Sequence, residues 1–337
     1  MPTKPPAKPS AKRSVLPPGL IVRAGKFVWN TMWHAMMSQM APRNKSGDYV
    51  RPESSFRGRQ ITAEAGRYRL IVGMSCPWAH RTLVTRALKG LEDAIAITTV
   101  YPSTDEGMWL FDADQLASPL SNCRSLPDFY SCTESGYKGR ATVPVLWDSK
   151  ANIIVNNESA EIIELLNSEF GALATGPDLY PDLLKEKIDS LNQKIYNAVN
   201  NGVYKCGFAQ TQAAYDQAVT ELFTTLDELD KILSTDRYLC GDTLTLADVR
   251  LFTTLIRFDV AYHGIFKCNR RRIADYPNLS GYLADIYQMP GIAGTCDIDA
   301  VKRDYFGNLF PLNPGGIVPI GPGWNSLTQP HGRDAAG

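Results

Sequence analysis

The chain has 337 residues, of which 44% are apolar and 21% are charged, and its formal net charge at pH 7 is zero. This composition is typical of a globular protein with a real core, and the balanced charge gives no reason to expect a nucleic-acid partner. The length suits two domains. There is no apolar run of about 18 residues and no apolar region typical of a secretory signal, so the sequence predicts neither a transmembrane segment nor secretion.

Basic residues and cysteines are distributed unevenly. The first 60 residues hold eleven Lys or Arg against two acids, Asp48 and Glu53. The seven cysteines are widely spaced without a C-x-x-C pair, so the sequence predicts neither a zinc ribbon nor a dithiol redox motif, and no metal is expected. An odd number of cysteines indicates free thiols in a reducing compartment; we expect the cytoplasm, with a plastid left open.

Residues 1–60 are predicted to be a basic extension that contains one amphipathic helix. Residues 1–19 are rich in Pro, Lys, Ala and Ser and have little to bury. Within residues 26–42, large apolar side chains recur at helical spacing: Trp29, Met32 or Trp33, Met36 and Met40. Such a face contacts a membrane surface or a partner, or packs on the protein's own core; packing is the commoner outcome and is favoured here.

Residues 61–172 form the first predicted domain, in which strand and helix patterns alternate. The expected order is strand, helix, strand, long insert, strand, strand and helix. The corresponding residue ranges are 67–74, 77–91, 94–101, 102–139, 141–148, 152–157 and 158–170. The first strand is expected to end where Gly73 permits a turn. The insert is far longer than an ordinary connection, which indicates a functional loop.

Residues 181–322 form a second predicted domain that is all helical, followed by a tail at 323–337. Apolar residues at helical spacing predict helices over 184–199, 215–233 and near 279–287. Another helix begins at Thr245, where Asp248 completes a capping box. The run FPLNPGGIVPIGPG that begins at Phe310 contains too many Pro and Gly residues to be helical.

Cys76 lies between the first predicted strand and the helix that begins at Pro77. The free N–H groups and the dipole of a helix N-terminus favour a thiolate, which is the nucleophilic form of cysteine. Because Ala79 stands where a second cysteine would resolve an internal disulfide, Cys76 is expected to form a mixed disulfide with a small thiol, of which glutathione is the obvious one. The alternative is a small buried residue without chemistry.

The other six cysteines are read as structural. Cys123 and Cys132 lie in the insert, where no helix start is predicted, and pairing between them under oxidation is not favoured. Glu158 and Ser159 begin a helix and suit the charged end of glutathione, although ordinary helix capping explains them as well. Val143 precedes Pro144 at the start of a strand. A proline in a strand must lie on an edge strand, at the first position of the strand or in a special peptide bond.

These motifs together resemble the glutathione transferase superfamily, and within it the Xi class, the glutathionyl-hydroquinone reductases. The resemblance covers residues 49–322 and rests on six stretches: CPWAHRTL, GMWLF, GRATVPVLWD, IVNNES, RFDVAYHGIFKCN and NPGGIVPIGP. It implies a fold of the α/β plus all-α kind: a thioredoxin-like N-terminal domain, with a cis proline facing the cysteine, and an all-helical C-terminal domain. It also implies a homodimer, glutathione as co-substrate, and reduction of glutathionyl-hydroquinones through a mixed disulfide between Cys76 and glutathione.

Carried over by position, the resemblance assigns two sets of residues besides Cys76. Those expected to bind glutathione are Trp109, Arg140, Val143, Glu158 and Ser159. Those expected to contact the quinone ring are Tyr204, Tyr305 and Tyr262, the first two also assisting catalysis; packing in a core is the alternative for these aromatic residues. The sequence departs from the family where Tyr305 is followed by Phe306, Gly307 and Asn308, which puts a second hydroxyl or a histidine at that place in doubt.

Two other functions stay open at this point. One is an omega-class-like thioltransferase or dehydroascorbate reductase. The other is a non-catalytic binding module of the same fold, with the N-terminal helix docked to a membrane surface or a partner. The sequence does not specify the natural quinone.

Overall fold

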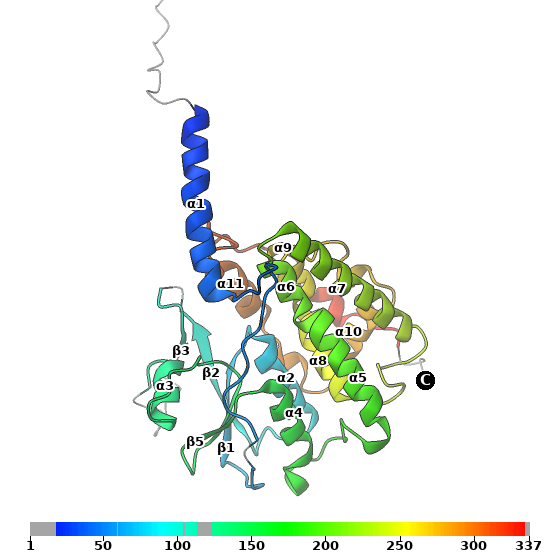
Figure 1. Cartoon of the computed structure of the whole chain (residues 1–337). Helices are drawn as coiled ribbons and strands as arrows, with labels where there is room; N and C mark the ends of the chain where they lie inside the picture. Colours follow the sequence, from blue (N-terminus) through cyan, green and yellow to red (C-terminus); the bar gives the residue numbers. More distant parts are fainter. Residues whose placement is uncertain (1–17, 59, 104, 113–122, 334–337) are drawn as a thin grey trace, which may run out of the picture.

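The computed structural model describes residues 18–58, 60–103, 105–112 and 123–333. Within them a sheet-containing domain lies beside a larger bundle of helices, and one long helix projects away from both (Figure 1). This confirms the predicted fold class. The predictions made for residues 1–17 and for the last four residues of the tail lie outside the described residues.

One mixed sheet forms the first domain. In the described residues its strand order is β3-β2-β1-β4-β5. The strands are β1 (Tyr68–Gly73), β2 (Ala96–Pro102), β3 (Trp109–Phe111), β4 (Val145–Asp148) and β5 (Ile153–Asn156). Only β1 and β2 pair in parallel, and each of the other neighbouring pairs is antiparallel. The central strand β1 is almost completely buried because helices or neighbouring strands cover it on every side.

Two helices, α2 (Pro77–Leu88) and α4 (Ser159–Ser168), lie between the sheet and the helical bundle (Figure 1). Each has two apolar faces. Leu83 and Ile162 belong to the core around the sheet, whereas Val84 and Ile163 belong to the core of the bundle. The two domains therefore share these helices and form one packed body.

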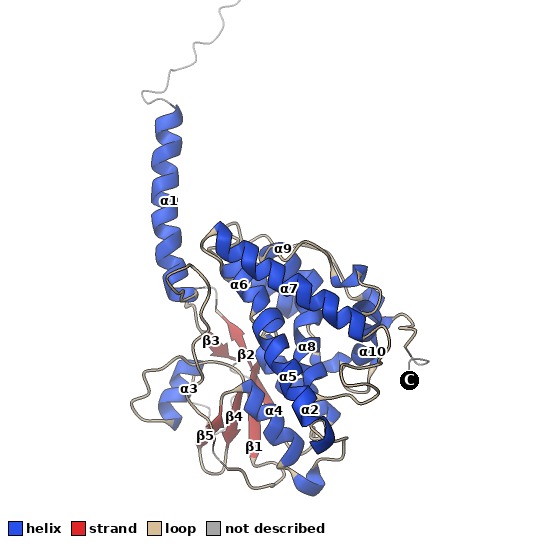
Figure 2. Ribbon diagram, turned by 45° about the vertical axis from the view of Figure 1, so that its right-hand side comes forward, coloured by secondary structure: helices blue, strands red, loops and turns tan. Residues whose placement is uncertain are grey.

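The second domain consists of helices packed side by side, as Figure 2 shows. They are α5 (Lys185–Ile195), α6 (Gly202–Phe208), α7 (Gln212–Ile232), α8 (Leu246–Arg257), α9 (His263–Ile265), α10 (Leu279–Gln288) and α11 (Ile298–Asn308). The predicted capping box is present, since the backbone N–H of Thr245 donates to Oδ2 of Asp248 at 2.8 Å. Wider helical turns at Tyr196–Asn200 and Phe258–Tyr262 follow α5 and α8 and were not predicted.

The insert contains a strand and a helix that the sequence analysis missed. Besides β3, it holds α3 (Leu126–Thr133), which begins at a capping box between Ser125 and Asp128. The statement that no helix starts near Cys132 was therefore wrong, because this residue lies within α3. The thiol of Cys123 is buried beside that of Cys132, and burial raises the pKa of Cys123 to about 12.

Helix α1 (Pro18–Met40) differs from the expectation that it packs on the protein's own core. Only its last turns do so: Met37 is fully buried, and the indole Nε1–H of Trp33 donates to the carbonyl of Pro311 at 3.1 Å. Residues 19–32 are all exposed, and the helix extends beyond the body of the molecule (Figures 1 and 2). No helix in the described part of the chain is long and apolar enough to cross a membrane.

Candidate functional site

Cys76 occupies the turn between β1 and α2, as predicted. It is the N-cap residue of α2 with extended backbone angles, and Pro77 takes the first helical position. Its N–H donates to the carbonyl of Gly73 at 3.0 Å, and its sulfur lies 3.8 Å from the carbonyl oxygen of Val143. The Val143–Pro144 peptide bond is cis. The thiol is thus partly exposed at a helix N-terminus.

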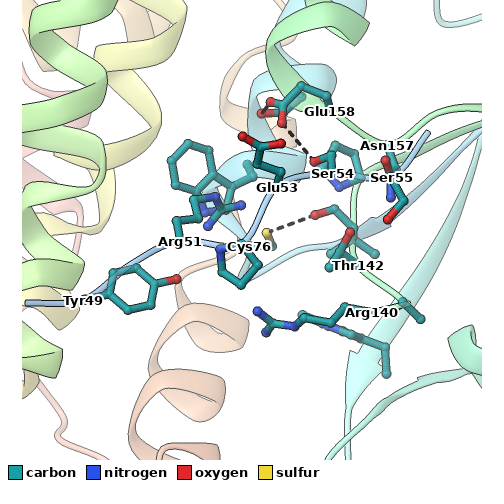
Figure 3. A pocket seen from close by; sticks show the side chains of 17 residues that line it. Tyr49, Arg51, Glu53, Ser54, Ser55, Cys76, Arg140, Thr142, Asn157 and Glu158 are labelled. Atoms are coloured by element: carbon teal, nitrogen blue, oxygen red, sulfur yellow. Dashed lines mark hydrogen bonds between the residues drawn. The ribbon is translucent and has the colours of Figure 1, made fainter. Parts of the chain in front are cut away.

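A polar hollow of about 270 Å³ opens over Cys76. All five residues expected to bind glutathione line it: Trp109, Arg140, Val143, Glu158 and Ser159. Figure 3 shows the sulfur of Cys76 between the segment that carries Arg51 and Glu53 and the loop that carries Thr142. The lining holds cationic and anionic side chains on different elements, so a zwitterionic ligand can find partners at both of its ends.

Sequence reasoning missed one side of this hollow. Tyr49 and residues 51–55, which it placed in the basic extension, line the hollow from one side. The hydroxyl of Ser54 donates to Oε2 of Glu158 at 2.9 Å, and the guanidinium of Arg51 lies 3.8 Å from the ring centre of Trp78. Extended segments held by such long-range contacts carry no local periodicity, so no sequence signal marked them.

Glu158 and Ser159 combine capping with a place in the hollow. Oε1 of Glu158 accepts from the N–H of Ala160 at 3.0 Å, which is the capping alternative considered for this pair. The buried guanidinium of Arg81 donates to the hydroxyl oxygen of Ser159 at 3.3 Å and to Oδ1 of Asn200 at 2.5 Å. Burial lowers the pKa of Arg81 to about 9. The start of α4 is therefore held by Arg81 of α2, which also bonds Asn200 of the bundle, while Glu158 and Ser159 line the hollow.

The strand β1 ends at Gly73 and a turn to Cys76 follows, as predicted. Gly73 does not adopt a positive φ, so the backbone angles of this turn do not require a glycine. A Cβ atom at this position would lie 2.4 Å from Cζ3 and 2.5 Å from Cη2 of Trp109. The absence of a side chain at Gly73 therefore lets the indole of Trp109 lie against the end of β1, beside Cys76.

A second, mostly apolar hollow adjoins the first. Its lining includes Cys76 and Trp109, which also belong to the polar hollow. The rest of the lining comes from β2, the start of α2, α6, α11 and adjoining turns: Ser75, Pro77, Pro102, Tyr204, Phe208, Asp304, Tyr305, Asn308 and Leu309. Tyr204 and Tyr305 thus line a mostly apolar space next to Cys76, and their contact with a quinone ring stays a prediction. The thiol of Cys76 stands at the junction of a polar space and an apolar one.

Three tyrosine hydroxyls meet beside the apolar hollow. The hydroxyl of Tyr305 lies 2.7 Å from that of Tyr204 and 3.0 Å from that of Tyr262. Burial raises the pKa of Tyr204 and of Tyr305 well above 10, and it raises the pKa of Tyr262 to about 12. All three phenols are therefore protonated at neutral pH. Tyr262 is fully buried and lines neither hollow, and it contacts both Tyr305 and the ring of Tyr204.

Arg257 at the end of α8 holds the backbone that precedes Cys76, a role that sequence reasoning did not assign. Its guanidinium donates to the carbonyl of Ser75 at 2.9 Å and to that of Met74 at 3.0 Å. It also lies 2.7 Å from Nδ1 of His80, whose pKa burial and this cation lower well below 6.5. A neutral His80 accepts the hydrogen bond, so the bundle anchors the turn of the cysteine through a buried cation.

Comparison with protein families matches both domains. The model described as "Glutathione S-transferase, N-terminal domain" matches residues 75–169, and the one described as "Glutathione S-transferase, C-terminal domain" matches residues 212–285. Glutathionyl-hydroquinone reductase YqjG of Escherichia coli strain K12 is 47% identical over 324 residues, covering 91% of this chain and 97% of that protein. Glutathionyl-hydroquinone reductase PcpF of Sphingobium chlorophenolicum is 44% identical over 301 residues, covering 88% and 94%.

Solved structures agree. The glutathione-bound structure of Escherichia coli YqjG superposes with a TM-score of 0.77 at 50% identity, covering 81% of this chain and 90% of that one. The glutathione-S-transferase Xi from Phanerochaete chrysosporium gives a TM-score of 0.78 at 45% identity, covering 83% and 94%. Sequence, fold and the placement of the cysteine lead to one conclusion: the chain belongs to the glutathione transferase superfamily, and within it to the Xi class.

Proposed function

We propose that this protein reduces S-glutathionyl-hydroquinones to hydroquinones, with glutathione as the reductant. The observation that carries the proposal is the position of Cys76, which lines both the polar and the apolar hollow. A glutathionyl-hydroquinone has the matching shape, since a zwitterionic tripeptide and an aromatic ring are joined at one sulfur. With the tripeptide in the polar hollow and the ring in the apolar one, that sulfur lies at the thiol.

In the polar hollow, charges of both signs support glutathione binding. Arg51 and Arg140 are the cations that pair with its carboxylates, whereas Glu53 and Glu158 are the carboxylates that pair with its ammonium group. The backbone of Val143, beside the cis bond, accepts and donates to the cysteinyl part, as an edge strand does. The indole of Trp109 covers the bound tripeptide.

The reaction proceeds in two displacements at sulfur. The thiolate of Cys76 attacks the glutathionyl sulfur; an S–S bond forms, the carbon–sulfur bond breaks, and its electron pair leaves with the ring carbon. A proton then adds to that carbon and gives the hydroquinone. A second glutathione thiolate attacks the glutathionyl sulfur of the mixed disulfide, which releases glutathione disulfide and the Cys76 thiolate. The net change is one carbon–sulfur bond reduced and two glutathiones joined.

The tyrosine cluster supplies the proton that the carbon leaving group needs. Tyr204 and Tyr305 remain protonated at neutral pH because burial raises the pKa of each phenol. Their hydroxyls are hydrogen-bonded to one another, so a proton lost by one is shared by the other. Tyr262 stabilises the pair from behind through its own bond to Tyr305.

The test is turnover of glutathionyl-menadione with glutathione in excess, following hydroquinone release, for wild type and Cys76→Ala. Release by wild type that is lost in Cys76→Ala supports the proposal. A Cys76→Ser variant, together with glutathione binding measured by calorimetry, shows that the hollow is intact. Glutathione binding without any release by wild type refutes the reductase and favours the non-catalytic module. Faster turnover of dehydroascorbate or simple mixed disulfides favours the omega-like alternative.

Two further properties belong to the same proposal. We expect a homodimer, which light scattering on the purified chain tests. We expect it to act in the cytoplasm, where glutathione is reduced and abundant. Localisation of a tagged full chain tests this second property.

A further inference from the structure

The free part of α1 exposes large apolar side chains that nothing in the described chain covers. Phe27 is 73% exposed, Val28 55%, Ile21 52% and Met32 50%. The helix rises away from the body (Figures 1 and 2), and residues 19–32 are all exposed. Such exposure is unusual for residues of this size and marks an interaction surface.

Most exposed apolar residues of α1 lie on one side of the helix, although Phe27 falls about 40° from Arg23. At about 100° per residue, Ile21, Val28 and Met32 fall within about 40° of one another. Arg23 and Lys26 fall on the opposite side. The apolar side, called the α1 face below, lines a hollow that is almost wholly apolar; its members are Leu20, Ile21, Ala24, Val28, Trp29 and Met32.

A second apolar element adjoins the base of α1. The chain after α11 exposes Phe310, Ile317, Val318 and Ile320, the last at 98%. The ring of Phe310 lies 6.5 Å from that of Trp29, centre to centre, so this loop continues the α1 face. Figure 1 shows the segment that follows α11 beside the lower end of α1. Two segments far apart in sequence thus present one apolar surface.

The N-terminal sequence that includes α1 carries charge of one sign. Residues 1–47 contain eight Lys or Arg and no Asp or Glu, and the first acid is Asp48. Arg23 and Lys26 are exposed on the helix itself. A positive segment of this kind is attracted to a surface of anionic groups.

We propose that α1 and the loop from Phe310 to Ile320 dock the protein on an anionic lipid bilayer. A rod with a wide apolar face, an opposite basic face and no acid lies in the plane of the headgroups, with Trp and Phe at the level of the interface. A protein partner would have to surround a helix that is exposed on most sides, whereas a bilayer surface can contact the helix along its whole length. The helix lies on the surface and does not cross it.

Docking in this way has a geometric consequence for the site. Asn308 and Leu309 line the apolar hollow, and the next residue, Phe310, belongs to the docking surface. The opening beside Cys76 therefore lies close to the bilayer. This step alone rests on the proposed function: aromatic substrates dissolved in the lipid would reach the hollow without crossing bulk water.

The experiment is co-sedimentation of the full chain with vesicles, either pure phosphatidylcholine or phosphatidylcholine with phosphatidylserine. The test variant is Ile21→Ser with Val28→Ser, on the α1 face. The matched control is Asn30→Ser, on the polar side of the same exposed helix. Turnover of a water-soluble glutathionyl-hydroquinone without vesicles is expected to be equal in all three proteins, which shows that the fold is intact whatever the binding result.

The expected result is binding to phosphatidylserine vesicles that weakens at high salt, falls at least tenfold in the double variant and is unchanged in Asn30→Ser. No binding to phosphatidylserine vesicles overturns the proposal, as does equal binding of the double variant or equal binding to neutral vesicles. Light scattering identifies the other occupant: if wild type is a dimer, the double variant a monomer, and neither binds vesicles, the surface belongs to a second copy. None of these negative outcomes bears on the reductase activity, which is measured separately.

Discussion

Replacing Arg257 by Met tests whether the helical bundle positions the reactive thiol. The variant keeps the aliphatic bulk but removes the hydrogen bonds to the carbonyls of Ser75 and Met74, which lie at 2.9 and 3.0 Å. A buried acceptor that loses its partner costs about 1–3 kcal/mol, so the two carbonyls together cost about 2–6 kcal/mol. Removing a buried cation that has no carboxylate partner among the described residues offsets part of this. We expect a loss of unfolding free energy of about 3 kcal/mol, within the range that a domain tolerates.

The activity should fall further than the stability implies. A shift of about 1 Å in the turn before Cys76 displaces the sulfur from the site of attack, which lowers kcat about 100-fold. Arg257→Lys retains the charge but only one of the two loop contacts, so its kcat should lie between those of Arg257→Met and wild type.

Three assays measure this: urea unfolding, kcat with saturating glutathione, and the rate at which iodoacetamide alkylates Cys76. The matched control is Arg333→Met. Arg333 is also buried and donates to backbone carbonyls, among them Leu233 at 3.1 Å, but far from the hollows. It should lose similar stability and retain kcat. If Arg257→Met keeps kcat and alkylation within threefold of wild type, or Arg333→Met loses as much activity, Arg257 does not position the thiol.

Three further outcomes are expected. In Gly73→Ala the new Cβ would lie 2.4 Å from the ring of Trp109, so the ring must move by about 1 Å and KM for glutathione should rise about tenfold. The control Gly294→Ala has open space around it and should not change this KM. An unchanged KM for glutathione in both variants contradicts the packing argument. Because the pKa of His80 is lowered in the folded chain, only the unfolded chain gains this proton as the pH falls below 6.5. The free energy of unfolding should therefore be constant above that pH and fall by at most about 1.4 kcal/mol per pH unit below it. Urea unfolding from pH 7.5 to 5.5 should show this slope for wild type and not for His80→Asn. Tyr305→Phe should lower kcat for glutathionyl-menadione about 100-fold and leave KM for glutathione unchanged. A rise in KM for glutathionyl-menadione without a fall in kcat would point to ring binding instead of proton donation.

Elements with a strong local signal were predictable from sequence. The helix that begins after Cys76 is marked by a preceding apolar strand, a turn and Pro77, and each of these signals lies within a few residues of its start. The capping box of Thr245 and Asp248 is equally local, and the structure contains it. The capping box of Ser125 and Asp128 has the same form, so the sequence held the signal for α3 that was overlooked.

Other features depend on contacts that periodicity does not encode. The pattern of α1 shows two faces but not what lies against them, and the structure leaves residues 19–32 without a core to join. The segment around Ser54 reaches the hollow through a bond to Glu158, 104 positions later. The role of Gly73 follows from the ring of Trp109, which lies on another strand. Each of these is decided by tertiary packing, where propensity is a weak guide.

Because Cys76 lines both hollows, its position determines the order in which the product leaves and the second glutathione enters in the proposed reaction. Displacement at sulfur needs the incoming and departing atoms on opposite sides of the sulfur attacked. The ring carbon therefore departs opposite Cys76, and in the next step the second glutathione must approach from that same direction. The hydroquinone has to vacate the apolar hollow before the reducing thiol can enter. The hydroquinone and the second glutathione thus compete for the same space, so added hydroquinone should act as a competitive inhibitor of the second glutathione. Bulky rings should slow the regeneration of the Cys76 thiolate more than they slow the first step.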